Sequence, residues 1–213
     1  MRVQRQDIID AAMALLDEVG VDGLTMRRLA GALNIQAPSL YWHFAGKQAL
    51  LDAMADALLA EMVLPPDCGS PWDEWLRAMA SEFRRVLKSR RDGARVYAGT
   101  FPPMDNVLRI GDRTIATLRA AGADERTALH ALLTLQYFVL GFTIEEQATL
   151  PPPGGGEGGV DLKRVVQQIT AEQAASYPAG AAAAVLMASD DADARFSFGL
   201  DRLIEGLRGV IPS

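Results

Sequence analysis

Apolar residues recur at three- and four-residue steps along most of the chain, which is the spacing of an amphipathic helix. One such stripe runs through 8–19, and the broadest apolar faces lie in 124–147 and 190–209. No segment shows the alternation of a half-buried strand, and no internal repeat is evident. The pattern therefore predicts an all-α protein of about ten helices.

Residues that begin and end helices stand at the boundaries of these stripes. Thr25 and Asp124 are good N-caps, Ser70 is expected to cap a helix that begins with a proline, and Asn34 tolerates a left-handed turn. The expected helices cover 8–19, 25–33, 38–44, 47–63, 70–90, 104–121, 124–147, 161–176 and 190–209, with a short segment at 94–98.

The chain is expected to divide between residues 46 and 47. Residues 1–46 would form a compact head of three short helices, and 47–213 a larger helical body, with the helix 47–63 as the connector. A tight turn joins the second and third helices of the head. This is the arrangement of a helix-turn-helix, whose recognition helix enters the major groove of DNA.

The candidate recognition helix leaves two interpretations open. Ser39 and His43 share one helical face and can read base edges, whereas Leu40 and Phe44 lie on the opposite face and are expected to fill the core. The alternative is that the adjacent aromatic residues are ordinary filling in a small helical domain. Composition alone does not separate the two.

An ordered set of short motifs in the head resembles the tetracycline-repressor (TetR) family. The motifs are DGLTMRRLA (22–30), LNI (33–35), PSLYWHF (38–44) and KQALL (47–51). The likeness continues in the body through Trp72, 83–85, 91–94, 99–100 and 140–141, where it is similar to the tetracycline-repressor subgroup.

The resemblance implies a homodimeric transcriptional regulator, expected to be a repressor, that binds a palindromic operator in double-stranded DNA and is released by a small effector. The helices 124–147 and 190–209 would form a four-helix bundle with their two-fold mates. The implied DNA-binding residues are Thr25, Arg27, Gln36, Ala37, Pro38, Ser39, Tyr41, Trp42, His43 and Lys47. The implied pocket residues are Val63, Met79, Phe83, Tyr97, Thr100, Phe101, Thr114, Leu129, Tyr137 and Glu145.

Several pocket positions depart from the pattern of relatives that bind magnesium-tetracycline. Those relatives carry a histidine metal ligand in place of Tyr97, a second histidine at Val63, an asparagine at Met79 and an arginine at Phe101. Glu145 remains, but a lone carboxylate does not make a magnesium site. We therefore expect no metal, no cofactor and no tetracycline response. The effector would be hydrophobic or aromatic, with a hydroxyl or amine for a tyrosine or Glu145.

Charge changes the picture only when it is counted by region. The 213 residues carry a net charge of −6, which by itself counts against nucleic acid. In 1–47, however, basic and acidic residues are equal in number, so the rest of the chain carries the whole net charge of −6. Within this region, the segment 24–47 holds only basic charged residues. We expect a polarised head with modest non-specific affinity for DNA.

The remaining chemistry argues against other classes of protein. A single cysteine, Cys68, excludes an intramolecular disulfide framework, and two histidines leave little for a metal cluster. His130 is expected to be a packed or hydrogen-bonded helix residue, and Glu145 with Glu146 a solvent-facing pair at a helix end, so an enzyme is disfavoured. A carrier without DNA binding is the other alternative.

No targeting segment is evident, and the longest apolar run is too short to span a membrane. That run, 131–144, is interrupted by Gln136 and closed by two glutamates. A span needs about 20 apolar residues, so a buried helix is expected instead. These features predict a soluble, cytoplasmic protein with no membrane partner.

Overall fold

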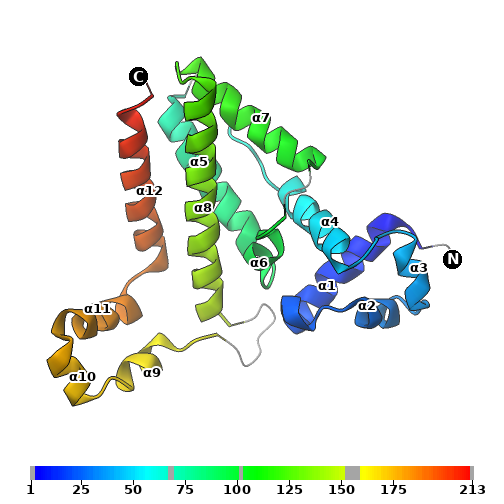
Figure 1. Cartoon of the computed structure of the whole chain (residues 1–213), viewed down its shortest axis with the longest axis horizontal. Coiled ribbons are helices and arrows are strands. Elements are labelled where there is room, and N and C mark those ends of the chain that lie inside the picture. Colours follow the sequence, from blue (N-terminus) through cyan, green and yellow to red (C-terminus); the bar gives the residue numbers. More distant parts are fainter. Residues whose placement is uncertain (1–2, 67–69, 101–102, 152–158, 212–213) are drawn as a thin grey trace.

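The computed structural model describes residues 3–66, 70–100, 103–151 and 159–211 (Figure 1). In this part of the chain there are twelve helices and no strand, which confirms the all-α prediction. The helices are α1 (Arg5–Gly23), α2 (Met26–Ala32), α3 (Ala37–Tyr41), α4 (Lys47–Ala60), α5 (Trp72–Lys88), α6 (Gly93–Tyr97), α7 (Asp105–Ala120), α8 (Glu125–Thr149), α9 (Leu162–Gln167), α10 (Ala171–Ser176), α11 (Pro178–Ser189) and α12 (Ala192–Arg208).

Local signals set the shape of the first three helices. The α1 helix kinks at Gly20, whose φ of 70° suits a residue without Cβ. The Thr25 hydroxyl accepts a hydrogen bond from the Arg28 amide at 3.2 Å, which confirms the predicted N-cap of α2. Asn34 adopts the predicted left-handed conformation with φ 51°. Leu40 and Phe44 are buried as predicted, and α3 packs against α2.

The α8 helix is the centre of the larger part of the chain. The α5, α6, α7 and α12 helices pack against it, and α12 runs beside it in Figure 1. The α4 helix contacts α1 on one side and α6 and α7 on the other, so it links the first three helices to the rest. Asp124 caps α8 as predicted, because its carboxylate accepts from the Thr127 amide at 2.7 Å.

Three predicted boundaries are wrong by a few residues. Pro71, not Ser70, occupies the N-cap position of α5, because its backbone is extended (ψ 143°) and its carbonyl accepts from the Trp75 amide. The α4 helix ends at Ala60 rather than near Val63. The α5 helix ends at Lys88 rather than Arg90.

The C-terminal third differs most from the prediction. The expected single helix over 161–176 is two helices, α9 and α10, because Thr170 starts a new helix with a capping box. The alanine-rich stretch forms α11, for which no helix was expected. None of α9, α10 and α11 contains a buried residue, and the three form a group away from α4–α7 in Figure 1.

The α8 helix was expected to be buried, and within one chain this is only partly correct. Of the described helices, α8 alone is long and apolar enough to cross a membrane by length and composition, yet only 28% of its most apolar window is buried. The buried residues form one stripe, from Ala128 through Leu135 and Val139 to Thr143. Much of its apolar surface is therefore open in a single chain.

Candidate functional site

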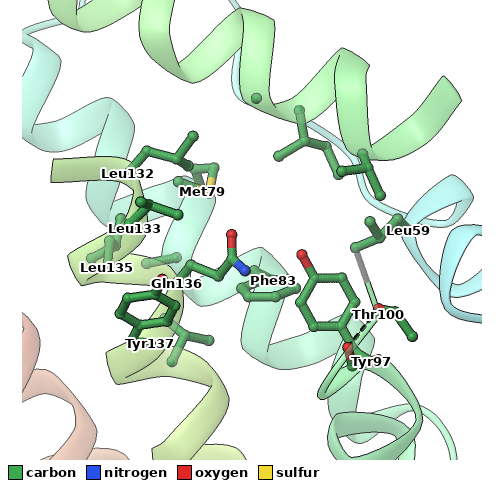
Figure 2. Close-up of a pocket in the computed structure, with 15 residues that line it drawn as sticks. Leu59, Met79, Phe83, Tyr97, Thr100, Leu132, Leu133, Leu135, Gln136 and Tyr137 are labelled. Carbon is green, nitrogen blue, oxygen red and sulfur yellow. Dashed lines mark hydrogen bonds between the residues drawn. The ribbon is translucent and has the colours of Figure 1, made fainter. Parts of the chain in front are cut away.

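A cavity of about 250 Å³ lies among α4, α5, α6, α7 and α8 (Figure 2). Its walls are mainly aliphatic and aromatic, and no acidic or basic side chain lines it among the described residues. The lining residues are Leu59, Met79, Ala80, Phe83, Tyr97, Thr100, Val107, Ile110, Gly111, Leu132, Leu133, Leu135, Gln136, Tyr137 and Val139. Apolar walls with a few polar groups are typical of small-molecule sites.

The structure brings together five of the ten predicted pocket residues, namely Met79, Phe83, Tyr97, Thr100 and Tyr137. They come from α5, α6, the turn after α6 and α8. The Tyr97 ring meets Phe83 edge to face, with centroids 5.2 Å apart. The Thr100 hydroxyl donates to the Tyr97 carbonyl at 2.6 Å, which ties the turn after α6 to the pocket wall.

Four other predicted pocket residues do not line this cavity, which corrects the prediction. Val63 follows the end of α4 and is 75% exposed. Thr114 is buried within the α7 packing, and its hydroxyl donates to the Ile110 carbonyl at 2.8 Å. Leu129 and Glu145 lie on exposed positions of α8. Phe101 lies outside the described residues.

Gln136 lines the cavity but was not among the ten predicted pocket residues. Its amide projects into the cavity from α8, opposite the Tyr97 hydroxyl on α6 (Figure 2). Neither the Gln136 amide nor the Tyr97 hydroxyl has a hydrogen-bond partner among the described residues. Burial raises the pKa of the Tyr97 phenol, so the hydroxyl stays neutral. A lone amide inside the longest apolar run is the signal that could have identified Gln136.

The α3 helix presents polar and aromatic side chains on its outer face. Trp42 is 89% exposed and Tyr41 is also exposed, so the interpretation of these residues as core filling is wrong. Ala37 and His43 are half-buried. Exposed positions around α3 also include Gln36, Pro38 and Ser39.

The three predicted phosphate or base contacts that flank α3 differ in their surroundings. Arg27 is exposed on α2, and Thr25 is exposed although its hydroxyl caps that helix. Lys47 is half-buried, and its ammonium donates to the Val21 carbonyl at 2.9 Å. In the free chain Lys47 therefore ties the start of α4 to the last turn of α1.

Hydrogen bonds and ion pairs join the end of α1 to the turn between α5 and α6. Asp17 accepts from the Arg90 guanidinium at 2.9 Å and from the Arg91 amide at 3.0 Å. Asp92, in a left-handed conformation with φ 55°, accepts from the Val21 amide at 2.9 Å. The α6 helix thus contacts the head at its start and carries Tyr97 of the cavity at its end.

The pair Glu145 and Glu146 is not the solvent-facing pair that was expected. Only Glu145 is exposed, whereas Glu146 is buried and accepts from Arg84 at 2.6 and 2.9 Å and from Lys88. Burial tends to raise the pKa of Glu146, but the two cations outweigh it and lower that pKa. His130, expected to be a packed or hydrogen-bonded helix residue, is exposed on α8. Among the described residues no three His, Cys, Asp or Glu side chains form a candidate metal site, and Cys68 lies outside them.

Two family models match consecutive parts of the chain. The model for bacterial regulatory proteins of the tetR family matches residues 8–54. The model for the tetracyclin repressor-like C-terminal domain matches residues 65–211.

Individual relatives cover nearly the whole chain. Tetracycline repressor protein class A from transposon 1721 of Escherichia coli is 40% identical over 208 residues, covering 97% of this chain and 91% of that protein. The crystal structure of a possible TetR family transcriptional regulator from Streptomyces coelicolor A3(2) is 40% identical with a TM-score of 0.85, covering 97% and 100% of the two chains. The structure of ActR, a Streptomyces coelicolor TetR family protein, in complex with actinorhodin is 30% identical with a TM-score of 0.84, covering 98% of each chain.

A helix-turn-helix with an exposed recognition helix, joined to a helical body around an apolar pocket, defines the class of ligand-responsive DNA-binding regulators. The chain belongs to the tetracycline-repressor (TetR) family of transcriptional regulators, as the resemblance implied. The relatives described above are transcriptional regulators rather than enzymes.

Proposed function

We propose that two copies of this chain bind a palindromic operator with the exposed faces of their α3 helices, and that a small hydrophobic or aromatic effector releases them. The observation that carries this proposal is the exposure of Tyr41 and Trp42 on a segment whose charges are all basic. A short helix with free polar and aromatic side chains suits a major groove. In this proposal the head is 1–46 and the body 47–213.

Dimerisation through α8 and α12 is supported by the apolar surface that one chain leaves open. Tyr137 on α8 and Phe198 on α12 are exposed, and most of the apolar window of α8 is uncovered. A two-fold interface would cover the same patch on both subunits. It would also hold the two heads about 34 to 36 Å apart, one turn of DNA.

Release would use the two helices that touch both the head and the pocket. The α4 helix begins at Lys47, which bonds to the head, and carries Leu59 in the pocket wall. The α6 helix connects Asp92, bonded to Val21, with Tyr97 of the pocket. An effector that fits better when these helices shift would favour a dimer whose two heads no longer match the spacing of the operator half-sites. To change the ratio of the released form to the DNA-binding form from 1:99 to 99:1, the effector must bind the released form more tightly by about 5.5 kcal/mol.

The same proposal includes a cytoplasmic location, no enzymatic activity and no response to magnesium-tetracycline. The absence of a response to magnesium-tetracycline is supported by the neutral pocket lining and by the tyrosine at position 97. Release of the operator by magnesium-tetracycline would contradict this part of the proposal.

The experiment is selection of bound sites from a random double-stranded DNA library, followed by mobility shifts on the recovered sequence. A palindromic site is expected. Trp42→Ala should weaken its binding by about ten-fold or more, because truncation of a large aromatic side chain at the centre of an interface commonly costs about 2 kcal/mol or more. Tyr177→Ala is the control, since Tyr177 is also an exposed aromatic residue and lies between α10 and α11, away from the first three helices. Recovery of no palindrome would favour the carrier alternative.

A further inference from the structure

The pocket contains two polar side-chain groups that have no hydrogen-bond partner among the described residues. Figure 2 shows the Gln136 amide and the Tyr97 hydroxyl projecting into the same space from α8 and α6. The other polar lining residue of α6 and its turn, Thr100, already donates to the Tyr97 carbonyl. No buried side-chain N or O atom among the described residues lacks a hydrogen-bond partner, so these two groups are open to the cavity and to the water in it. A ligand that displaces this water has to replace its hydrogen bonds, so one that offers a matching acceptor gains affinity and selectivity over one that does not.

The charge of the lining restricts the ligand further. None of the described lining residues is acidic, basic or histidine. A charged effector would lose its water without gaining an opposite charge, which costs several kcal/mol. The exposed carboxylate of Glu145 is not part of this lining, so an amine has no anionic partner in the pocket of one chain.

The hydrogen-bonding capacities of the two groups point to one complementary atom. A phenol can donate one hydrogen bond and can also accept, and a carboxamide offers two donors and one acceptor, so both groups can donate to one acceptor atom. A single carbonyl oxygen has two lone pairs and can accept from both groups at once. The faces and edges of Phe83, Tyr97 and Tyr137 favour a flat aromatic frame around that oxygen.

We propose that the effector is an uncharged, flat aromatic molecule with a ring carbonyl oxygen, held by donation from the Tyr97 hydroxyl and the Gln136 amide. This inference rests on the proposed function, because it assigns the chemical class of the effector. It makes Gln136 and Tyr97 the residues that determine specificity within an otherwise apolar pocket.

The test compares four tricyclic probes on the full chain by titration calorimetry: 9,10-anthraquinone, anthracene, anthraquinone-2-carboxylate and protonated 9-aminoacridine. We expect anthraquinone to bind at least about ten-fold more tightly than anthracene, since a buried donor left unpaired weakens binding by about that factor. The two charged probes should bind more weakly than anthraquinone. Gln136→Leu and Tyr97→Phe should each reduce the preference for anthraquinone over anthracene.

The matched control is Gln167→Leu, because Gln167 is an exposed glutamine on α9, outside the pocket. It should keep the full preference for anthraquinone. Equal binding of anthracene and anthraquinone, tight binding of a charged probe, or failure of all four to bind would overturn the inference. A preference that Gln136→Leu leaves unchanged would also overturn it.

Failure of the proposed function gives a different result. If no palindromic operator is recovered but the preference for anthraquinone depends on Gln136, the regulator model fails and the assignment of the pocket stands. If an operator is recovered and a non-carbonyl compound releases it without any dependence on Gln136 or Tyr97, the regulator model stands and the assignment fails.

Discussion

Two glutamines on the same helix have opposite surroundings. Gln147, near the end of α8, accepts from the Ala94 amide at 3.1 Å and donates to the Leu87 and Arg90 carbonyls at 3.2 and 2.8 Å. Gln136, nearer the middle of α8, has no partner among the described residues and faces the pocket. The first amide fastens the turn between α5 and α6 to α8, whereas the second is open to a ligand.

The comparison extends to the charged groups next to Gln147. Glu146 is buried against Arg84, which also pairs with Asp193 on α12 at 2.7 Å and lies over the Phe196 ring. The polar side chains of Glu146 and Gln147 near the end of α8 are therefore bonded to other groups of the protein. The middle of α8 is an apolar pocket with unmet polar groups. Polar residues at the first place should govern stability, and polar residues at the second should govern ligand choice.

The largest effect on stability is expected for Glu146→Gln. It removes the carboxylate that Arg84 and Lys88 share, so the buried Arg84 keeps only its ion pair with the more exposed Asp193, which should lower the free energy of unfolding by about 3 kcal/mol. The control is Glu145→Gln, its exposed neighbour, which should change stability by less than about 0.5 kcal/mol. Urea unfolding at one fixed protomer concentration measures both. Equal losses in the two variants would contradict this role of Glu146.

The same carboxylate should make stability depend on acid pH. The pKa of Glu146 is lowered in the folded chain by Arg84 and Lys88, so the folded state binds fewer protons than the unfolded state near pH 4. This contribution is complete above the ordinary glutamate pKa of about 4.3 and is lost as the pH falls through the lower folded value. Urea unfolding between pH 7 and pH 3 should show a flatter acid limb for Glu146→Gln than for Glu145→Gln. If the free energy of unfolding falls equally with acid pH in the two variants, Glu146 does not make this contribution.

A second, smaller loss is expected for Gln147→Leu. The change leaves the Ala94 amide and the Leu87 and Arg90 carbonyls without this side-chain partner, which should cost about 2 kcal/mol. Hydrogen exchange should show the additional opening at the Ala94 amide first, because that amide loses its acceptor. Unchanged protection at Ala94 would mean that Gln147 does not hold this turn.

Features set by neighbouring residues could be predicted from the sequence. The caps of α2 and α8 depend on a hydroxyl or carboxylate within the next turn, and both were predicted correctly at Thr25 and Asp124. The left-handed Asn34 belongs to the same category. In each case the interacting groups lie within a few residues of each other along the sequence.

Features that depend on packing between distant helices could not be predicted in this way. Glu145 and Glu146 are adjacent, and which of them is buried depends on the position of Arg84, far away on α5. Leu129 and Gln136 lie on one helix, but only the rotation of α8 against α5 and α7 turns Gln136 into the cavity. The resemblance therefore identified the helices around the pocket, but only five of the ten residues that it implied line the cavity.

The smallest effect on stability is expected for Gln136→Leu, the same chemical change that should be costly at Gln147. No hydrogen bond is lost among the described residues, and an apolar side chain suits the aliphatic wall of Leu132, Leu133 and Leu135. The free energy of unfolding without ligand should change by less than about 0.5 kcal/mol. The comparison with Gln147→Leu cancels the intrinsic difference between glutamine and leucine, so the remaining gap of about 2 kcal/mol reports the partners alone. A loss above about 1 kcal/mol at Gln136 would mean that its amide already has a partner in the free protein. In that case it would not be available to a ligand.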